Sequence, residues 1–135
     1  MLTITLVRPP QVLSANVLTI SQGTPNIGIA YLVGSIKAAG HKVFVVDALG
    51  ERLDQFTPFN DSKMLINGLT SLELVKLIPE ESDLIGITCM FSNEWFYTKL
   101  VIDEIAQMFP KALIVAGGEH VTADPFYSLR TAADL

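Results

Sequence analysis

The feature that most constrains this fold is a regular alternation of short apolar runs with helix-like segments. Strand-sized runs of aliphatic and β-branched residues occupy residues 2–7, 42–47, 83–89 and 112–116. Between them, apolar residues recur three and four positions apart, which is the period of an amphipathic helix. Alternating strands and helices predict a parallel sheet joined by helical crossovers. Because the runs are apolar throughout, we expect helices to cover both faces of that sheet.

This pattern predicts an α/β fold, a Rossmann-like or flavodoxin-like doubly wound parallel sheet in three layers. Right-handed crossovers leave few topologies, and we expect the strand order 2-1-3-4, with a fifth strand to follow. Helices are expected to begin at Pro25 or Asn26, Thr70 or Ser71, Ser92 or Asn93, and Thr122 or Asp124. Residues 11–26 and 48–70 contain breakers such as Pro58, Asn60 and Asp61, and we predict irregular loops there.

The length and the ends of the sequence bear on its domain organisation. The 135 residues suffice for one domain with a core of its own. The last residues, 133–135, stand where the fifth strand of a doubly wound sheet would begin. We therefore expect residues 1–135 to be a single, incomplete domain of a longer protein.

Composition excludes several classes of function. Half of the residues are hydrophobic, 17% are charged, and the net charge is −5 without a basic cluster. Nucleic-acid binding is not expected, because phosphate contacts need clustered Lys and Arg. No apolar run approaches the ~20 residues that span a bilayer. The N-terminus also lacks the regions of a signal peptide, so we expect a cytoplasmic protein without a membrane contact.

The residues that could carry chemistry are few. Cys89 is the single cysteine, which excludes a disulfide or a cysteine-based metal cluster within these residues. His41 and His120 lie far apart and have no partner at metal-ligand spacing. We therefore predict no metal-ligating and no catalytic side chain. Cys89 acting as a nucleophile with His120 as its base is an alternative, weaker than an inert buried cysteine.

The carboxyl ends of the expected strands form the candidate binding site. In a doubly wound sheet, ligands bind outside these ends where the strand order reverses. The loops after the first, third and fourth strands combine small, hydroxyl and bulky apolar residues, typical of a cleft for a large, mostly neutral ligand. Gly117 and Gly118 would let the backbone approach such a ligand without a Cβ. The alternative is that they only make a tight turn. Phosphate-binding glycine motifs are absent from the sequence.

Three segments of the chain, in order and spacing, resemble a known family. They are Arg8-Pro9-Pro10 with residues 24–32 and 39–47, then Asp83 to Met90, then Val115 to Pro125. They resemble the N-terminal cobalamin-binding domain of cobalamin-dependent radical S-adenosylmethionine enzymes. The resemblance implies a sheet that holds the corrin ring over its strand ends and the nucleotide tail at its edge.

The resemblance also implies which residues contact the cofactor. The residues expected near the corrin and its lower face are Thr24, Pro25, Asn26 and Ile27. Those expected to line the tail are Thr88, Met90, Gly117, Gly118 and His120. Related domains bind cobalt through the histidine of an Asp-x-His-x-x-Gly motif, and the matching positions here are Gly23 and Pro25. The chain therefore resembles the subgroup that binds cobalamin without a protein histidine on cobalt.

By this resemblance, the chain is a non-catalytic module of a methyltransferase or a rearranging enzyme. Its partners would be cobalamin and the radical S-adenosylmethionine domain of the parent protein. The iron–sulfur cluster and S-adenosylmethionine would belong to the remainder of that protein, because their Cys-x-x-x-Cys-x-x-Cys motif is not found here. The alternative is a degenerate Rossmann-like interaction or scaffold domain. An open sheet edge could also pair in a homodimer.

Overall fold

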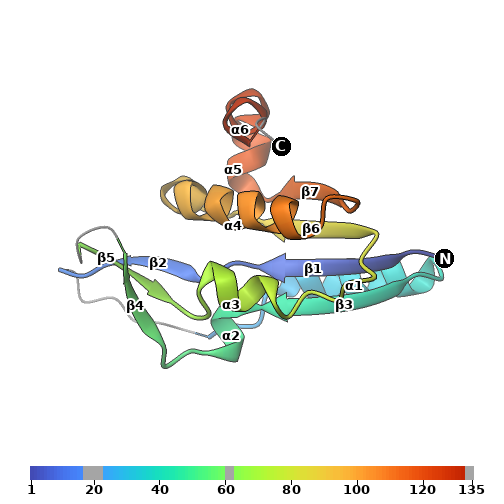
Figure 1. The fold of residues 1–135 in the computed structure, drawn as a ribbon, viewed down its shortest axis with the longest axis horizontal. Coiled ribbons are helices and arrows are strands. Elements are labelled where there is room, and N and C mark those ends of the chain that lie inside the picture. The colour runs from blue at the N-terminus through green and yellow to red at the C-terminus, as the bar shows by residue number, and fades with distance from the viewer. Residues whose placement is uncertain (17–22, 60–62, 133–135) are drawn as a thin grey trace.

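The main sheet has the predicted class and strand order (Figure 1). The computed structural model describes residues 1–16, 23–59 and 63–132. Within these residues the sheet contains β1 (Thr3–Arg8), β3 (Lys42–Asp47), β6 (Leu84–Thr88) and β7 (Leu113–Gly117). All neighbours pair in parallel in the order β3-β1-β6-β7. This is the expected order 2-1-3-4. Residues 133–135, the expected start of a fifth strand, lie outside the described residues.

Helices lie on both faces of this sheet, as predicted. They are α1 (Ile27–Ala38), α2 (Ala48–Glu51), α3 (Ser71–Val75), α4 (Trp95–Met108), α5 (Glu119–Ala123) and α6 (Pro125–Ala132). Side chains alternate across a strand, so Ile4 and Leu6 of β1 face α1 and pack with its Ile29. Val7 and Ile85 belong to the opposite face, where the larger core also includes side chains of α3 and α4.

The helix starts agree with the sequence at two places and differ at a third. The Asn26 side chain caps α1 by accepting a hydrogen bond from the Ile29 amide. Thr70 and Glu73 form a reciprocal capping box at α3. The prediction that Ser92 or Asn93 caps the third long helix is wrong, because the short 3₁₀ helix η1 (Ser92–Glu94) comes first and neither side chain caps α4.

A second sheet contradicts the prediction of loops at residues 11–26 and 48–70. It consists of β2 (Gln11–Ser14), β5 (Met64–Asn67) and β4 (Phe56–Phe59), antiparallel in the order β2-β5-β4. These strands have four residues each, too short for a clear alternation of side chains. Pro58 does not prevent pairing because β4 is an edge strand. Asn60 and Asp61, named as breakers, lie outside the described residues.

A two-residue connection joins the two sheets. Only Pro9 and Pro10 separate β1 from β2, and Figure 1 shows β2 continuing beyond the carboxyl end of β1. The second sheet also packs on α4, where the Phe59 ring meets the Tyr97 ring edge-on at 5.3 Å between centroids. The second sheet therefore lies beside the carboxyl ends of the parallel strands, where the candidate site was predicted. Among the described residues, no helix has the length and apolar character needed to cross a bilayer.

Candidate functional site

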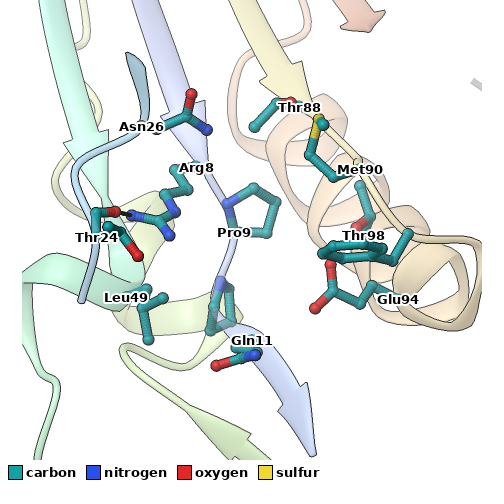
Figure 2. A pocket seen from close by; sticks show the side chains of 12 residues that line it. Arg8, Pro9, Gln11, Thr24, Asn26, Leu49, Thr88, Met90, Glu94 and Thr98 are labelled. Atoms are coloured by element: carbon teal, nitrogen blue, oxygen red, sulfur yellow. Dashed lines mark hydrogen bonds between the residues drawn. The ribbon is translucent and has the colours of Figure 1, made fainter. Parts of the chain in front are cut away.

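A cavity of about 300 Å³ opens at the carboxyl ends of β1 and β6 (Figure 2). Its walls come from β1, the chain before α1, the loop after β6, and the start of α4. The residues that line it are Arg8, Pro9, Pro10, Gln11, Thr24, Asn26, Leu49, Thr88, Met90, Phe91, Glu94 and Thr98. The order β3-β1-β6-β7 reverses direction between β1 and β6. The cavity therefore lies at the switch point, where doubly wound sheets bind ligands.

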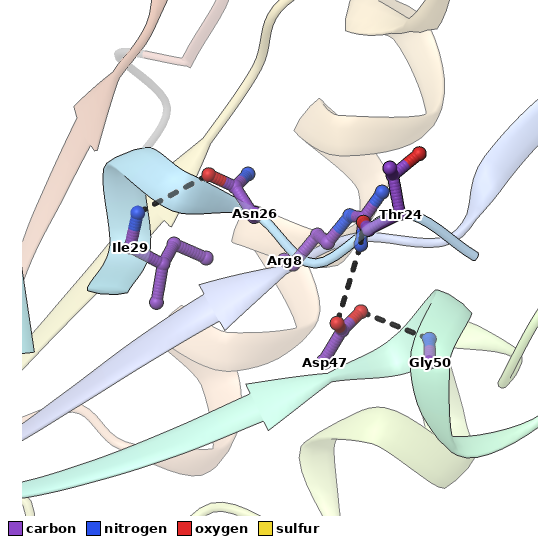
Figure 3. Close-up of polar contacts among 6 residues, drawn as sticks. All are labelled: Arg8, Thr24, Asn26, Ile29, Asp47 and Gly50. Atoms are coloured by element: carbon purple, nitrogen blue, oxygen red, sulfur yellow. Dashed lines mark hydrogen bonds and ion pairs between the residues drawn. The ribbon is translucent and has the colours of Figure 1, made fainter. Parts of the chain in front are cut away.

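Arg8 connects three elements at one side of the cavity (Figure 3). Its guanidinium donates to the Thr24 carbonyl at 2.9 Å and pairs with the Asp47 carboxylate at 3.2 Å. The other Asp47 oxygen accepts from the Gly50 amide at 2.9 Å and so caps α2. Arg8 thus fixes the chain before α1 against the ends of β1 and β3, and its charge is already neutralised.

The opposite side of the cavity presents apolar side chains that remain accessible. Thr88 ends β6, and the following Met90 and Phe91 side chains are 44% and 62% exposed. Exposed apolar surface around a cavity that also has polar walls is characteristic of ligand sites. This side of the cavity suits an apolar or aromatic group of a ligand.

The two glycines after β7 have different structural roles. Gly118 has φ +107°, and a Cβ there would run into the Cys89 carbonyl oxygen. The tight-turn interpretation therefore holds for Gly118. Gly117 pairs with Thr88 across the sheet, and a Cβ there would meet no heavy atom within 4 Å. Close approach of a ligand thus remains the interpretation to test at Gly117.

His120 is buried behind the glycine turn rather than in the cavity. Its Nδ1 lies 2.9 Å from the Ser92 hydroxyl, and its ring packs against the Trp95 ring at 4.8 Å between centroids, with the ring planes tilted by 32°. The Tyr127 ring meets it edge-on at 6.2 Å. Its Nε2 is buried and has no hydrogen-bond partner within the described residues. This contact also explains why Ser92 does not cap a helix, since its hydroxyl is next to His120.

The environment of Cys89 disfavours a nucleophilic role. The side chain is buried, with Sγ 3.5 Å from the Phe91 carbonyl. Burial raises the pKa of the Cys89 thiol. Because the thiolate is the reactive form of cysteine, these surroundings favour an inert buried Cys89 over a nucleophilic one.

Two polar residues of the cavity were not predicted from the sequence. Burial raises the pKa of Glu94, although its carboxylate accepts a hydrogen bond from the Val12 backbone and lies in the field of Arg8. The Gln11 side-chain oxygen is buried without a partner in the described part of the chain. The sequence predicted a loop at Gln11 and a helix at Glu94, and no pattern indicated that either residue belongs to a binding site.

The nine predicted contacts divide into two groups. Four of them line the cavity: Thr24, Asn26, Thr88 and Met90. Five are not part of its lining: Pro25, Ile27, Gly117, Gly118 and His120. Ile27 begins α1 with its side chain 71% exposed. In the described residues, no group of three or more His, Cys, Asp and Glu side chains is arranged to hold a metal ion.

A doubly wound sheet with a cavity at its switch point defines a ligand-binding α/β domain. Residues 13–135 match the family model of the B12 binding domain. The chain therefore belongs to the B12-binding domain family, and membership implies cobalamin as its ligand. Over 101 residues, it is also 26% identical to the cytidylyl-2-hydroxyethylphosphonate methyltransferase of Streptomyces wedmorensis. That match covers 73% of this chain and 19% of the relative, so the chain spans about a fifth of that protein's length.

The residues present fit a cofactor of this kind. Cobalamin combines a broad ring rimmed with amide groups and a flat aromatic base. The free space in front of Gly117, beside Thr88, leaves room for a flat group against the backbone. On the same face of β7, Leu113 and Val115 are 63% and 46% exposed, which continues an apolar surface from Gly117.

Proposed function

We propose that this chain is the cobalamin-binding module of a cobalamin-dependent radical S-adenosylmethionine enzyme. The observation that carries the proposal is the open space in front of Gly117, next to Thr88, whose strand β6 borders the switch point of the sheet. Membership in the B12-binding family and a relative named as a methyltransferase support it. Methyl transfer is the favoured reaction of the parent enzyme, with radical rearrangement as the alternative.

The proposed contacts form two groups, each with two residues in the cavity lining and the others next to them in sequence or across the sheet. Near the corrin and its lower face we place Thr24, Pro25, Asn26 and Ile27, at the start of α1. Along the nucleotide tail we place Thr88, Met90, Gly117, Gly118 and His120. In this arrangement Gly117 admits the tail, Gly118 allows the turn that positions it, and His120 supports that turn from behind.

The module itself would bind and orient the cofactor. When bound, cobalamin supplies a cobalt centre that can accept and pass on a methyl group. Arg8 fixes the chain before α1, so the corrin-facing residues are held before the ligand arrives. We propose that residues 1–135 are one domain of a longer protein. A separate domain would then carry the iron–sulfur cluster and S-adenosylmethionine and meet the upper face of the corrin.

A titration with hydroxocobalamin, followed by visible absorbance and calorimetry, tests this function. We expect saturable binding with the spectrum of cobalamin whose own base has left the cobalt. Gly117→Val should weaken binding at least about tenfold, because the added side chain would occupy the space proposed for the tail. A loss of ~1.4 kcal/mol of binding free energy is enough for this effect. Gly34→Val is the matched control. A Cβ at Gly34 also meets no heavy atom within 4 Å, but Gly34 lies within α1 and is not one of the proposed contacts.

The outcomes separate the tail placement from the function. Equal affinity of the Gly117→Val variant and the parent chain would reject the placement of the tail at β7. Absence of saturable binding by the parent chain would reject the cofactor function itself. That result would favour a scaffold domain.

One observation favours a second candidate function, that of an interaction or scaffold domain. Among the described residues, β7 is an edge strand of the main sheet, and a groove of about 1120 Å³ lies between it, α4 and α6. An unpaired edge is a site where another chain can add a strand. In this candidate a second copy pairs there. A monomeric mass at high concentration in solution scattering would contradict it.

A further inference from the structure

Helix α1 is apolar around its whole circumference, although one side of it packs on the sheet. Its single charged residue is Lys37, and its buried residue is Ile29. On the outer side, Tyr31 is 74% exposed and lies next to a shallow hollow. The hollow is lined mainly by small residues: Ala30, Tyr31, Gly34, Ser35 and Ala38. A helix that is apolar on all sides is normally buried, so we expect the outer side of α1 to be covered in the working protein.

The sheet face on which α1 packs is only partly covered. In Figure 1, α1 lies behind β1 and β3. Leu113 and Val115 of β7 belong to the same face and are 63% and 46% exposed. Strands lie about 4.8 Å apart and a helix is about 10 Å wide, so a four-stranded sheet has room for two helices on a face. Among the described residues, the core cluster on this face contains side chains of one helix, α1.

The exposed area of the chain is large for its mass. The whole chain exposes 8103 Å². A compact monomer of the same 14.7 kDa exposes about 6,900 Å², so the chain exposes about 1,200 Å² more than expected. A standard protein–protein interface removes about 800 Å² from each partner. The additional exposed area is therefore enough for one stable dimer interface.

We infer that two copies of the chain pair face to face, so that α1 of each copy packs by its outer side on β6 and β7 of the other. A two-fold axis parallel to the strands produces this arrangement, because it turns the two α1 faces toward each other and sets the two helices side by side. Each copy then supplies the second helix for which the other's sheet has room. The surfaces that meet are apolar, with Tyr31 and the small residues of α1 on one side and Leu113 and Val115 on the other. The free edge of β7 takes no part, so this dimer differs from pairing of strand edges.

The same symmetry brings α1 of the second copy to the proposed binding site. The helix of a βαβ unit runs antiparallel to its strands, so α1 begins at the sheet edge where the strands end. The first turn of the second copy's α1 therefore lies at the carboxyl end of β7 and closes the open space in front of Gly117. This consequence rests on the proposed cobalamin function, because that space is where we place the nucleotide tail. The dimer itself does not rest on it.

Sedimentation equilibrium over a wide range of protein concentration tests the dimer. We expect the mass of two chains, twice 14.7 kDa. Tyr31→Lys places a charge within the apolar contact and should raise the dissociation constant of the dimer at least about tenfold. Leu72→Lys is the matched control, because Leu72 is 65% exposed but belongs to α3, on the opposite face of the sheet. Its dissociation constant should equal that of the parent.

A mixing experiment tests which surfaces meet. Val115→Glu changes the other side of the contact and should weaken the dimer as Tyr31→Lys does. An equal mixture of the two variants should form dimers again. In the mixed pair one of the two equivalent contacts is unchanged, and the other joins opposite charges. A mixture that stays monomeric would overturn the packing of α1 on the other copy's β7.

Two further results would overturn the inference. One is a monomeric mass of the parent protein at the highest concentration, and the other is a dimer that Tyr31→Lys leaves intact. A titration with hydroxocobalamin then tests the closed space, and Tyr31→Lys should bind it at least about fivefold more weakly than the parent. Equal affinity would overturn the closure by the second copy. Failure of a dimeric parent protein to bind hydroxocobalamin would reject the cofactor function and not the dimer.

Discussion

Replacing Gly118 by alanine should destabilise the fold whether or not a cofactor is bound. Gly118 has φ +107° and ψ 177°, a backbone region that essentially only glycine adopts. A Cβ there would run into the carbonyl oxygen of Cys89, and the Cys89 carbonyl carbon lies only 2.9 Å from the same position. The substitution therefore meets both an unfavourable backbone conformation and a steric conflict with backbone atoms.

The magnitude follows from how firmly Cys89 is held. A residue in this backbone region costs about 1–3 kcal/mol. The Cys89 carbonyl cannot simply move away, because the Cys89 amide donates to Gly117 at 2.8 Å and its oxygen accepts from His120 at 3.3 Å. Losing one of these hydrogen bonds adds about 1 kcal/mol. Together these terms give a loss of about 2–4 kcal/mol, which lowers Tm by about 7–14 °C in a chain of this length.

Gly117→Ala is the matched control for this prediction. It adds the same methyl group one residue earlier, where no heavy atom lies within 4 Å and φ is not positive. Its free energy of unfolding should stay within about 1 kcal/mol of the parent value. Urea unfolding of both variants without cofactor, with Tm from calorimetry, makes the comparison. Equal stability of the two variants would refute the argument that the backbone at Cys89 requires glycine at position 118.

Two further predictions concern buried titratable groups. Cys89 should react with a thiol reagent at pH 8 at least about a hundredfold more slowly in the native protein than in urea, because burial both blocks access and raises its pKa; equal rates would contradict this. Burial also raises the pKa of Glu94, so the folded state holds that proton more tightly than the unfolded chain. Stability should therefore fall as pH rises from the unfolded pKa through the folded pKa. We therefore expect the free energy of unfolding of Glu94→Gln, relative to that of the parent, to be more favourable at pH 7 than at pH 4. Urea unfolding at both pH values measures this difference, and the same difference at both would argue against the prediction.

The main sheet was predictable because each of its strands is a run of five or six mostly apolar residues. Ile85 and Ile87 in β6 are almost fully buried, which requires apolar residues at successive inward positions. The second sheet was not predictable, because each of its strands has four residues and β2 pairs with β5 across a long sequence separation. The pairing of Gln11 with Asn67 is an example, since neither residue favours a strand by itself.

The candidate site was predictable in position more than in detail. Strand order places the loops after β1 and β6 together, and the family resemblance then singled out Thr88 and Met90, which line the cavity. Glu94 could not, because its position in the cavity depends on β2 and on the 3₁₀ turn before α4. His120 follows two glycines in sequence, yet its ring turns toward Trp95, a contact set by tertiary packing.

The two prolines between β1 and β2 have a mechanical consequence. Proline fixes φ near −65°, so Pro9 and Pro10 leave the connection few dihedral angles about which to bend. Because the cavity wall includes both prolines and Gln11, a force applied to the second sheet reaches the ligand cavity directly. A displacement of the second sheet relative to the main sheet would therefore move Gln11 and change the shape of the cavity.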